Sequence, residues 1–266
     1  MDSMRTSAVE IEERRLAGIE SVEQYPSFHE RHRVFPAIFE ERAHRRIIDL
    51  SAGVGLVGQR IKDGYPAEII CNDITPTCLK ILQKMGLQTV SFDLDDEQTP
   101  YPIEDGAFDA AISLATIEHL LHPDYFLRQV QRILRDDGYL YISTPNYASI
   151  LYLPRLVLKG ETFHNPLSRN ERTRYEFYGH VRYFTYKTLL EFVSSFGFSP
   201  RAVYMPLPAE SAHYKQRLAR SRPKALAYRY AMTFMYRFLS PRWAPEPVLC
   251  FQKSVDGGGR FRKVLL

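Results

Sequence analysis

Short apolar runs alternate with segments of helical periodicity over the first half of the chain. The runs of strand length lie at 46–49, 67–71, 89–92, 108–113 and 138–143. Between them, apolar residues recur every three or four positions at 56–61, 76–85 and 123–134. Strands that alternate with helices are typical of a parallel sheet with helices packed on its faces.

The pattern changes after the fifth strand. A clear amphipathic helix is predicted at 185–196 and ends at Gly197, and strands are predicted at 201–205 and 247–253. A further helix over 26–45 leads into the first strand. The expected fold is therefore α/β, with a doubly wound, mostly parallel sheet of seven strands and helices on both faces.

This pattern divides the chain into a polar N-terminal extension, one domain and a tail. We expect the extension at 1–25, the domain at 26–254 and a flexible tail at 255–266. Two insertions, 147–184 and 207–246, follow the fifth and sixth strands. Because both strands run toward the edge where such sheets bind ligands, both insertions should begin on the substrate side.

Composition indicates the class of protein and the compartment in which to expect it. A hydrophobic content of 45% and a charged content of 25% are ordinary for a soluble globular protein. Cys71, Cys78 and Cys250 are widely spaced and form neither a disulfide framework nor a zinc pattern, so we expect a reducing cytoplasm and no metal. The charged first residues lack the apolar core of a secretion signal, and no apolar run reaches membrane-spanning length.

Charge is concentrated in one segment. Residues 211–245 hold eight lysines and arginines and no acidic residue, so the rest of the chain is net negative although the formal net charge is +4. Aromatic residues are interleaved with these basic ones. The favoured interpretation is a helix that packs its apolar face and solvates its charges. A peripheral contact with anionic lipid, or with a lipid-linked or phosphorylated acceptor, comes second, and nucleic acid is the least favoured partner.

The loop after the first strand carries the clearest chemical signal. Asp49 ends the strand, and Gly53, Gly55 and Gly58 follow in a turn that opens a helix. Glycines in such a loop let backbone N–H groups approach a nucleotide-like cofactor. The loop alone does not say which cofactor, although the G-x-G-x-x-G spacing matches the dinucleotide fingerprint.

Acidic residues also follow the next two strands. Asp73 comes 20 residues after Gly53, where a carboxylate suits a ribose diol, and Asp93 follows the third strand, where it suits an adenine amino group with Leu94 beside the ring. Aspartate also favours strand-to-loop turns for purely structural reasons. Three acids in series beside a glycine loop favour a ligand site.

The order of these motifs resembles that of class I S-adenosylmethionine-dependent methyltransferases, in particular the small-molecule branch with the ubiquinone-biosynthesis O-methyltransferases. The matching blocks are I-I-D-L-S-A-G-V-G, C-N-D-I, F-D-L, P-I-E-D-G-A-F-D-A-A-I-S-L-A-T-I-E-H-L, V-Q-R-I-L-R-D-D-G-Y-L-Y-I-S-T-P-N and G-H-V-R-Y-F-T-Y-K-T-L-L-E-F-V-S-S-F-G-F. They cover 46–198, and the last strand adds to the likeness. The resemblance implies transfer of a methyl group to an O, N or C nucleophile of a small-molecule, glycan or lipid-linked acceptor.

The resemblance also implies residue roles. Asp49, Gly53 and Gly55 would hold the methionine end of S-adenosylmethionine, and Ser113 and Leu114 would pass near it. Asp73 would bind both ribose hydroxyls, and Asp93 and Leu94 would frame the adenine. Ser51 stands where the family usually has glycine. A serine fits this turn if its φ is negative, and its hydroxyl is able to help hold the cofactor.

Two alternatives stay open. The G-x-G-x-x-G match fits a nicotinamide-dinucleotide-dependent oxidoreductase, although that class leaves the later blocks unexplained. A protein that binds the cofactor but has lost catalysis, and acts as a partner of another protein, is the second alternative.

Methyl transfer needs a general base only for some acceptors. The candidates are His180, Tyr178 and His119. We expect His180, in the first insertion, to be the best base, and His119, beside Glu118, to have a structural or cofactor-supporting role. Basic residues in or next to the same insertion are candidates for holding an anionic substrate: His164, Arg169, Arg172, Arg174 and Arg182.

Overall fold

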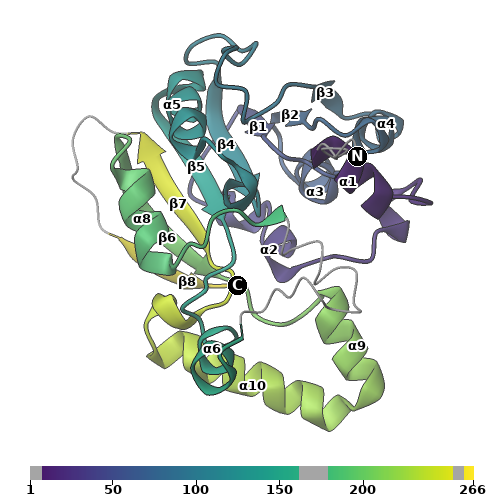
Figure 1. The fold of residues 1–266 in the computed structure, drawn as a ribbon, viewed down its shortest axis with the longest axis vertical. Helices are drawn as coiled ribbons and strands as arrows, with labels where there is room; N and C mark the ends of the chain where they lie inside the picture. Colours follow the sequence, from purple (N-terminus) through teal and green to yellow (C-terminus); the bar gives the residue numbers. More distant parts are fainter. Residues whose placement is uncertain (1–7, 162–178, 254–260) are drawn as a thin grey trace, which may run out of the picture.

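The computed structural model describes residues 8–161, 179–253 and 261–266. Its centre is one eight-stranded sheet with the order β3-β2-β1-β4-β5-β7-β6-β8 (Figure 1). The strands are β1 Arg46–Asp49, β2 Glu68–Asn72, β3 Gln88–Val90, β4 Phe108–Leu114, β5 Leu134–Ser143, β6 Phe198–Met205, β7 Val248–Lys253 and β8 Arg262–Leu265. The described helices are α1 Ala8–Arg15, α2 Glu30–Arg33, α3 Leu56–Gly64, α4 Pro76–Lys84, α5 Pro123–Ile133, α6 Leu153–Lys159, α8 Tyr186–Ser194, α9 Ala212–Arg220 and α10 Arg222–Phe238.

The sheet is mostly parallel, as expected. Only β7 runs antiparallel to its neighbours β5 and β6 among the described strands. Strands β5 and β6 therefore point the same way, and both insertions begin at the edge where β1, β2 and β4 also end. The strand positions predicted from the sequence agree with the structure to within about four residues.

Both faces of the sheet are covered. Successive residues of one strand, such as Ile47 and Ile48, enter different apolar clusters, because side chains alternate along a strand. Helices α5 and α8 pack on one face through residues such as Val130 and Leu189. Helix α3 and the segment before β1 pack on the other, where Phe35, Phe39 and Ile61 are buried. This confirms the doubly wound architecture.

The two ends of the chain differ from the sequence-based expectation. The expected helix over 26–45 is instead the short α2 followed by a 3-10 turn at Ala37–Phe39. The predicted flexible tail contains β8, which pairs in parallel with β6, so the sheet has eight strands rather than seven. Only four residues form β8, which is too short for its pattern to stand out in the sequence.

The N-terminal extension is also packed onto the domain. Leu16 is buried against Val54 of the glycine loop and Cys78 and Ile81 of α4. The carboxylate of Glu13 in α1 accepts hydrogen bonds from the N–H and hydroxyl of Thr77 at the start of α4. These contacts bring α1 beside the cofactor-type loop.

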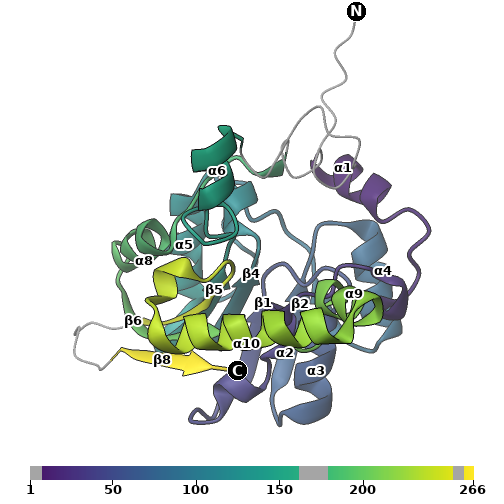
Figure 2. The same cartoon turned by 90° about the horizontal axis from the view of Figure 1, so that it is seen from below.

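The basic segment forms two helices. Helices α9 and α10 contact each other, and α10 runs across one side of the molecule (Figure 2). Its residues Met232, Met235 and Tyr236 are buried in the larger cluster. Among the described residues, no helix is both long enough and apolar enough to cross a membrane.

Candidate active site

The glycine loop joins β1 to α3. Gly53 has φ +54° and Gly55 has φ +85°, a region that strains other residues. A Cβ on Gly55 would lie 2.8 Å from Leu82 Cδ2, whereas a Cβ on Gly53 would meet nothing within 4 Å. Gly58 is close to β2, since its Cβ would lie 2.9 Å from Cys71 Sγ. The third glycine therefore serves close packing of the helix on the sheet, and Gly53 faces open space.

Asp73 connects the end of β2 to this loop. One carboxylate oxygen accepts a hydrogen bond from the N–H of Gly53 at 2.9 Å, and the other accepts from the N–H of Thr75 at 2.8 Å. Asp73 thus holds the loop and the start of α4 together. Carboxylate oxygens can accept more than one hydrogen bond, so both remain able to accept from a diol.

Asn72, which the sequence analysis does not single out, ties three strand ends together. Its side-chain N–H groups donate to the carbonyls of Leu50 and Phe92, and its side-chain oxygen accepts from the N–H of Phe92. The sequence feature that could have predicted this role is an amide side chain next to Asp73 at the end of a buried strand. An amide both donates and accepts, whereas a carboxylate only accepts.

Asp93 and Leu94 follow β3, which ends earlier than predicted, at Val90. Asp93 is exposed, and its carboxylate accepts from the N–H of Asp95. Leu94 is buried, and its carbonyl accepts from the hydroxyl of Tyr101 at 2.8 Å. This pair presents an accessible carboxylate beside an apolar side chain.

Ser51 reaches across to the loop after β4. Its hydroxyl is hydrogen-bonded to that of Thr116. Its φ is not among the positive values of the described residues, so serine fits the turn as expected. In the same loop Ala115 has φ +54°, a strained value for alanine, directly after Leu114. Ser113 is fully buried, and its hydroxyl has no hydrogen-bond partner among the described residues.

The charge of this edge favours a cationic ligand. Burial raises the pKa of Asp49 to about 7, and the charge of Asp73 adds to this. Burial also raises the pKa of Asp73, where Glu12 adds to the effect. Among the described residues no lysine or arginine forms an ion pair with either carboxylate. A buried and a half-buried carboxylate without a basic partner in the described part of the chain fit the positive charge of S-adenosylmethionine and oppose the pyrophosphate of a nicotinamide dinucleotide.

The Asp49 carboxyl should make the ligand-free protein less stable at high pH. Its pKa is about 7 in the folded protein and about 4 in an unfolded chain, so the folded state binds the proton more tightly. Ionising Asp49 therefore lowers the free energy of unfolding. This loss is absent below pH ~4, grows between pH ~4 and 7, and is complete above pH ~7. In urea unfolding without cofactor, Asp49→Asn should gain up to about 4 kcal/mol over the natural protein at pH 8 and almost nothing at pH 4. An equal difference at both pH values would contradict this.

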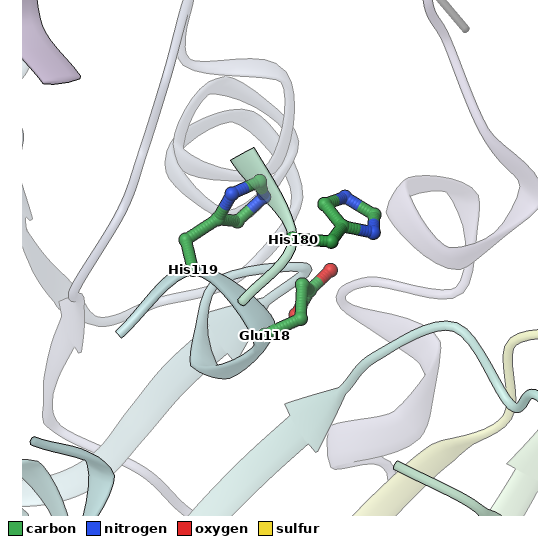
Figure 3. A group of neighbouring side chains, drawn as sticks. All are labelled: Glu118, His119 and His180. Carbon is green, nitrogen blue, oxygen red and sulfur yellow. The ribbon is translucent and has the colours of Figure 1, made fainter. Parts of the chain in front are cut away.

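A second group of polar side chains lies beyond the end of β4. Ligand atoms of Glu118, His119 and His180 all lie within 4.8 Å of one another (Figure 3). Glu118 and His119 belong to a 3-10 turn at Ile117–His119, and His180 comes from the end of the first insertion. The two imidazole rings meet edge to face, with centroids 4.6 Å apart. The structure therefore joins the two predicted histidines and adds Glu118.

Backbone hydrogen bonds hold these two segments together. The N–H groups of Val181 and Arg182 both donate to the carbonyl of Glu118, at 2.9 and 3.0 Å. The guanidinium of Arg182 donates to the carbonyls of Leu120 and Leu121, so this predicted substrate arginine is engaged with the backbone. The remaining predicted residues of the insertion lie outside the described residues: His164, Arg169, Arg172, Arg174 and Tyr178.

Comparison with known proteins identifies the family. The family described as methyltransferase domain matches residues 20–203, more than half of the 266 residues. The chain therefore belongs to the methyltransferase-domain family, as the sequence motifs predict.

Curated relatives match over shorter regions. Ajmaline N-methyltransferase of Rauvolfia serpentina is 34% identical over 99 residues, which cover 35% of this chain and 33% of that protein. A ubiquinone biosynthesis O-methyltransferase of Xanthomonas oryzae pv. oryzae is 26% identical over 107 residues, 39% of this chain and 44% of that protein. The chain thus matches a third to less than half of the length of these relatives.

Solved structures share the fold. Phosphoethanolamine N-methyltransferase 2 of Haemonchus contortus, in complex with S-adenosyl-L-methionine, has a TM-score of 0.55 at 14% identity over 84% of this chain and 52% of that chain. The [4+2]-cyclase SpnF has a TM-score of 0.55 at 16% identity over 85% of this chain and 82% of that chain. Since one neighbour is named a cyclase, the reaction has to be argued from the site.

Proposed function

We propose that the protein transfers a methyl group from S-adenosylmethionine to an O, N or C nucleophile of a small-molecule, glycan or lipid-linked acceptor. The observation that carries this proposal is a pair of carboxylates beside the glycine loop: Asp49, which is buried, and Asp73, which is half-buried and accepts a hydrogen bond from the N–H of Gly53. Family membership supports it. None of the relatives described above is a nicotinamide-dependent oxidoreductase, and nothing found favours an inactive partner protein.

The cofactor-binding roles fit the geometry. In our proposal the methionine end lies against Asp49, Gly53 and Gly55, with Ser113 and Leu114 nearby and Ser51 bracing the loop through Thr116. The ribose hydroxyls donate to Asp73, and Asp93 with Leu94 accepts the adenine. When bound, S-adenosylmethionine supplies a methyl group already activated by its sulfonium. The residues of the chain then have to position the acceptor and exclude water.

We assign the acceptor side to the group beyond β4. His180 lies 4.6 Å from His119, ring centroid to centroid, and its Nδ1 is 2.9 Å from the hydroxyl of Tyr147. His180 is thus oriented by a neighbour and is our choice for accepting a hydrogen bond from the nucleophile. His119 supports it, and Tyr178 remains a candidate outside the described residues.

Calorimetry with S-adenosylhomocysteine and with oxidised nicotinamide dinucleotide tests the cofactor class. We expect saturable binding of the first at one molecule per chain and none of the second. Transfer of labelled methyl groups into a cell extract, followed by identification of the labelled product, tests the reaction and names the acceptor. Binding of the dinucleotide alone would overturn the proposal.

We also propose a reducing, cytoplasmic setting with peripheral contact to anionic membranes. All three cysteines are free and buried, which suits a reducing compartment. On α10 the side chains of Tyr230, Phe234 and Phe238, spaced four residues apart, are 73%, 64% and 66% exposed. They share a segment without acidic residues, so aromatic and basic groups are available to the same lipid surface.

Replacing the exposed aromatic residues should weaken this contact. The double substitution Phe234→Ser and Phe238→Ser should lower co-sedimentation with phosphatidylserine vesicles by roughly tenfold or more, given the apolar area lost. Leu121→Ser, an exposed apolar site outside the basic segment, should leave it unchanged. The contact should also weaken with salt. Absence of vesicle binding at low salt, or binding to single-stranded nucleic acid instead, would rule the membrane contact out.

A further inference from the structure

The group beyond β4 has the composition of a metal site. Two loops about 60 residues apart in the chain bring together one carboxylate and two imidazoles, with one ligand atom of each within 4.8 Å of the others. Figure 3 shows the three side chains gathered between the end of β4 and the returning insertion. One carboxylate and two histidines form a donor set that zinc and other divalent transition metals accept in proteins.

Glu118 gives the independent reason to expect a cation. Its side chain is 0% exposed, and neither carboxylate oxygen makes a well-formed hydrogen bond to a described residue, although the hydroxyl of Thr144 and the backbone N–H of Glu118 itself lie close to it. The nearby Arg31 is engaged by Glu246 at 2.5 Å. A buried carboxylate without a well-formed hydrogen bond is costly, and a bound cation relieves that cost.

In both histidines, one ring nitrogen makes a hydrogen bond of the kind that orients a metal-binding histidine. Nδ1 of His119 lies 2.9 Å from the carbonyl of Gly179, which can only accept, so Nδ1 carries the proton and Nε2 carries the lone pair of the neutral ring. Nδ1 of His180 lies 2.9 Å from the hydroxyl of Tyr147. Metal-binding histidines almost always make such a hydrogen bond through their second nitrogen.

We propose that Glu118, His119 and His180 bind one divalent transition-metal ion of the zinc class. Ligand atoms about 2.1 Å from a common ion lie roughly 3–4 Å apart. Closing the group onto an ion therefore needs side-chain movement on the order of 1 Å. Three protein ligands leave at least one coordination position for a further oxygen. The sequence predicts no metal here because its ligands come from two distant segments and include no cysteine.

The site has a consequence that rests on the proposed function. The 3-10 turn with Glu118 follows β4 directly, so the ion would lie beyond Ser113 and Leu114 on the acceptor side. A hydroxyl of the acceptor that coordinates the ion loses its proton more readily, and this replaces the direct hydrogen bond to His180. The inferred acceptor class is therefore a hydroxylated small molecule.

Metal titration of the full chain tests the site directly. Protein dialysed against a chelator is titrated with Zn²⁺ by calorimetry and with Co²⁺ by visible absorption. We expect one ion per chain, and Co²⁺ bands typical of mixed nitrogen and oxygen ligands. Glu118→Gln and His180→Ala should each weaken Zn²⁺ binding at least about 100-fold, because losing an outer contact alone costs 10–100-fold. Tyr147→Phe should weaken it by roughly tenfold.

The control is His122→Ala. His122 lies near Asp95 and Glu97 on the surface, so a nonspecific site there would lose the ion in this variant, whereas the proposed site would not. Absence of Zn²⁺ binding to the natural protein, or unchanged affinity in Glu118→Gln, overturns the inference. S-adenosylhomocysteine binding without metal is measured in parallel. If it persists while Zn²⁺ fails, only the metal site is wrong, and if it also fails, the proposed function is wrong.

Discussion

Asp73→Ala should reduce the affinity for S-adenosylhomocysteine by at least about 100-fold, as two charge-assisted hydrogen bonds of about 1.5–3 kcal/mol each would predict. The substitution removes the carboxylate proposed to accept from both ribose hydroxyls. It also removes the acceptor for the N–H groups of Gly53 and Thr75, so the glycine loop loses its tie to β2. Calorimetry gives the affinity, and circular dichroism checks that the fold is retained.

Two companions separate binding from loop support. Asp73→Asn keeps one acceptor oxygen for the loop but loses the charge, and should weaken binding by an intermediate amount. Asp63→Ala changes an exposed aspartate on α3 that is hydrogen-bonded to Gln59, and should leave the affinity unchanged. Full affinity in Asp73→Ala would refute the role assigned to this carboxylate.

Gly55→Ala should destabilise the folded protein by roughly 2–4 kcal/mol, whereas Gly53→Ala should cost only about 1 kcal/mol. Both glycines have positive φ, so alanine is strained at either position. Only at Gly55 does the added Cβ also collide, at 2.8 Å from Leu82 Cδ2 in the packed interior. Urea unfolding of the ligand-free variants measures the difference.

The loss of cofactor affinity should follow the opposite order, with Gly53→Ala affected more than Gly55→Ala. The Cβ of Gly53→Ala enters the open space that faces the ligand, so its loss of S-adenosylhomocysteine affinity should exceed what its small stability loss explains. Gly58→Ala is the control, because that glycine packs against Cys71 and should affect stability alone. Equal stability for the Gly53 and Gly55 variants would show that the contact with Leu82 relaxes freely.

The sequence predicts the parts of the site that depend on local pattern. Strand ends, the glycine loop and the place of Asp73 follow from apolar runs and their spacing, and the structure brings Asp73 to Gly53 as the strand order requires. The contact of Ser51 with Thr116 was not predictable, because it joins residues 65 positions apart. The hydrophobic pattern carries no information about such pairs.

The same limit applies to the group beyond β4. Glu118 looks like an ordinary residue at a turn, and only the return of the insertion at His180 gives it neighbours. The packing of α1 and the pairing of β8 were missed because short, polar segments show little periodicity, and their stability comes from tertiary contacts rather than from their own residues. The ends of the domain are therefore less predictable than its centre.

The contacts of one carboxylate near the start of the chain indicate the order in which parts of the chain can fold during synthesis. Glu30 in α2 accepts from the backbone N–H groups of Ala209, Glu210 and Ser211, which open the second insertion. During synthesis the ribosome makes Glu30 long before these three residues exist. The entry to α9 therefore cannot dock until some 180 residues later. The central strands can pair while the chain is still growing, and the second insertion is among the last parts of the molecule to dock.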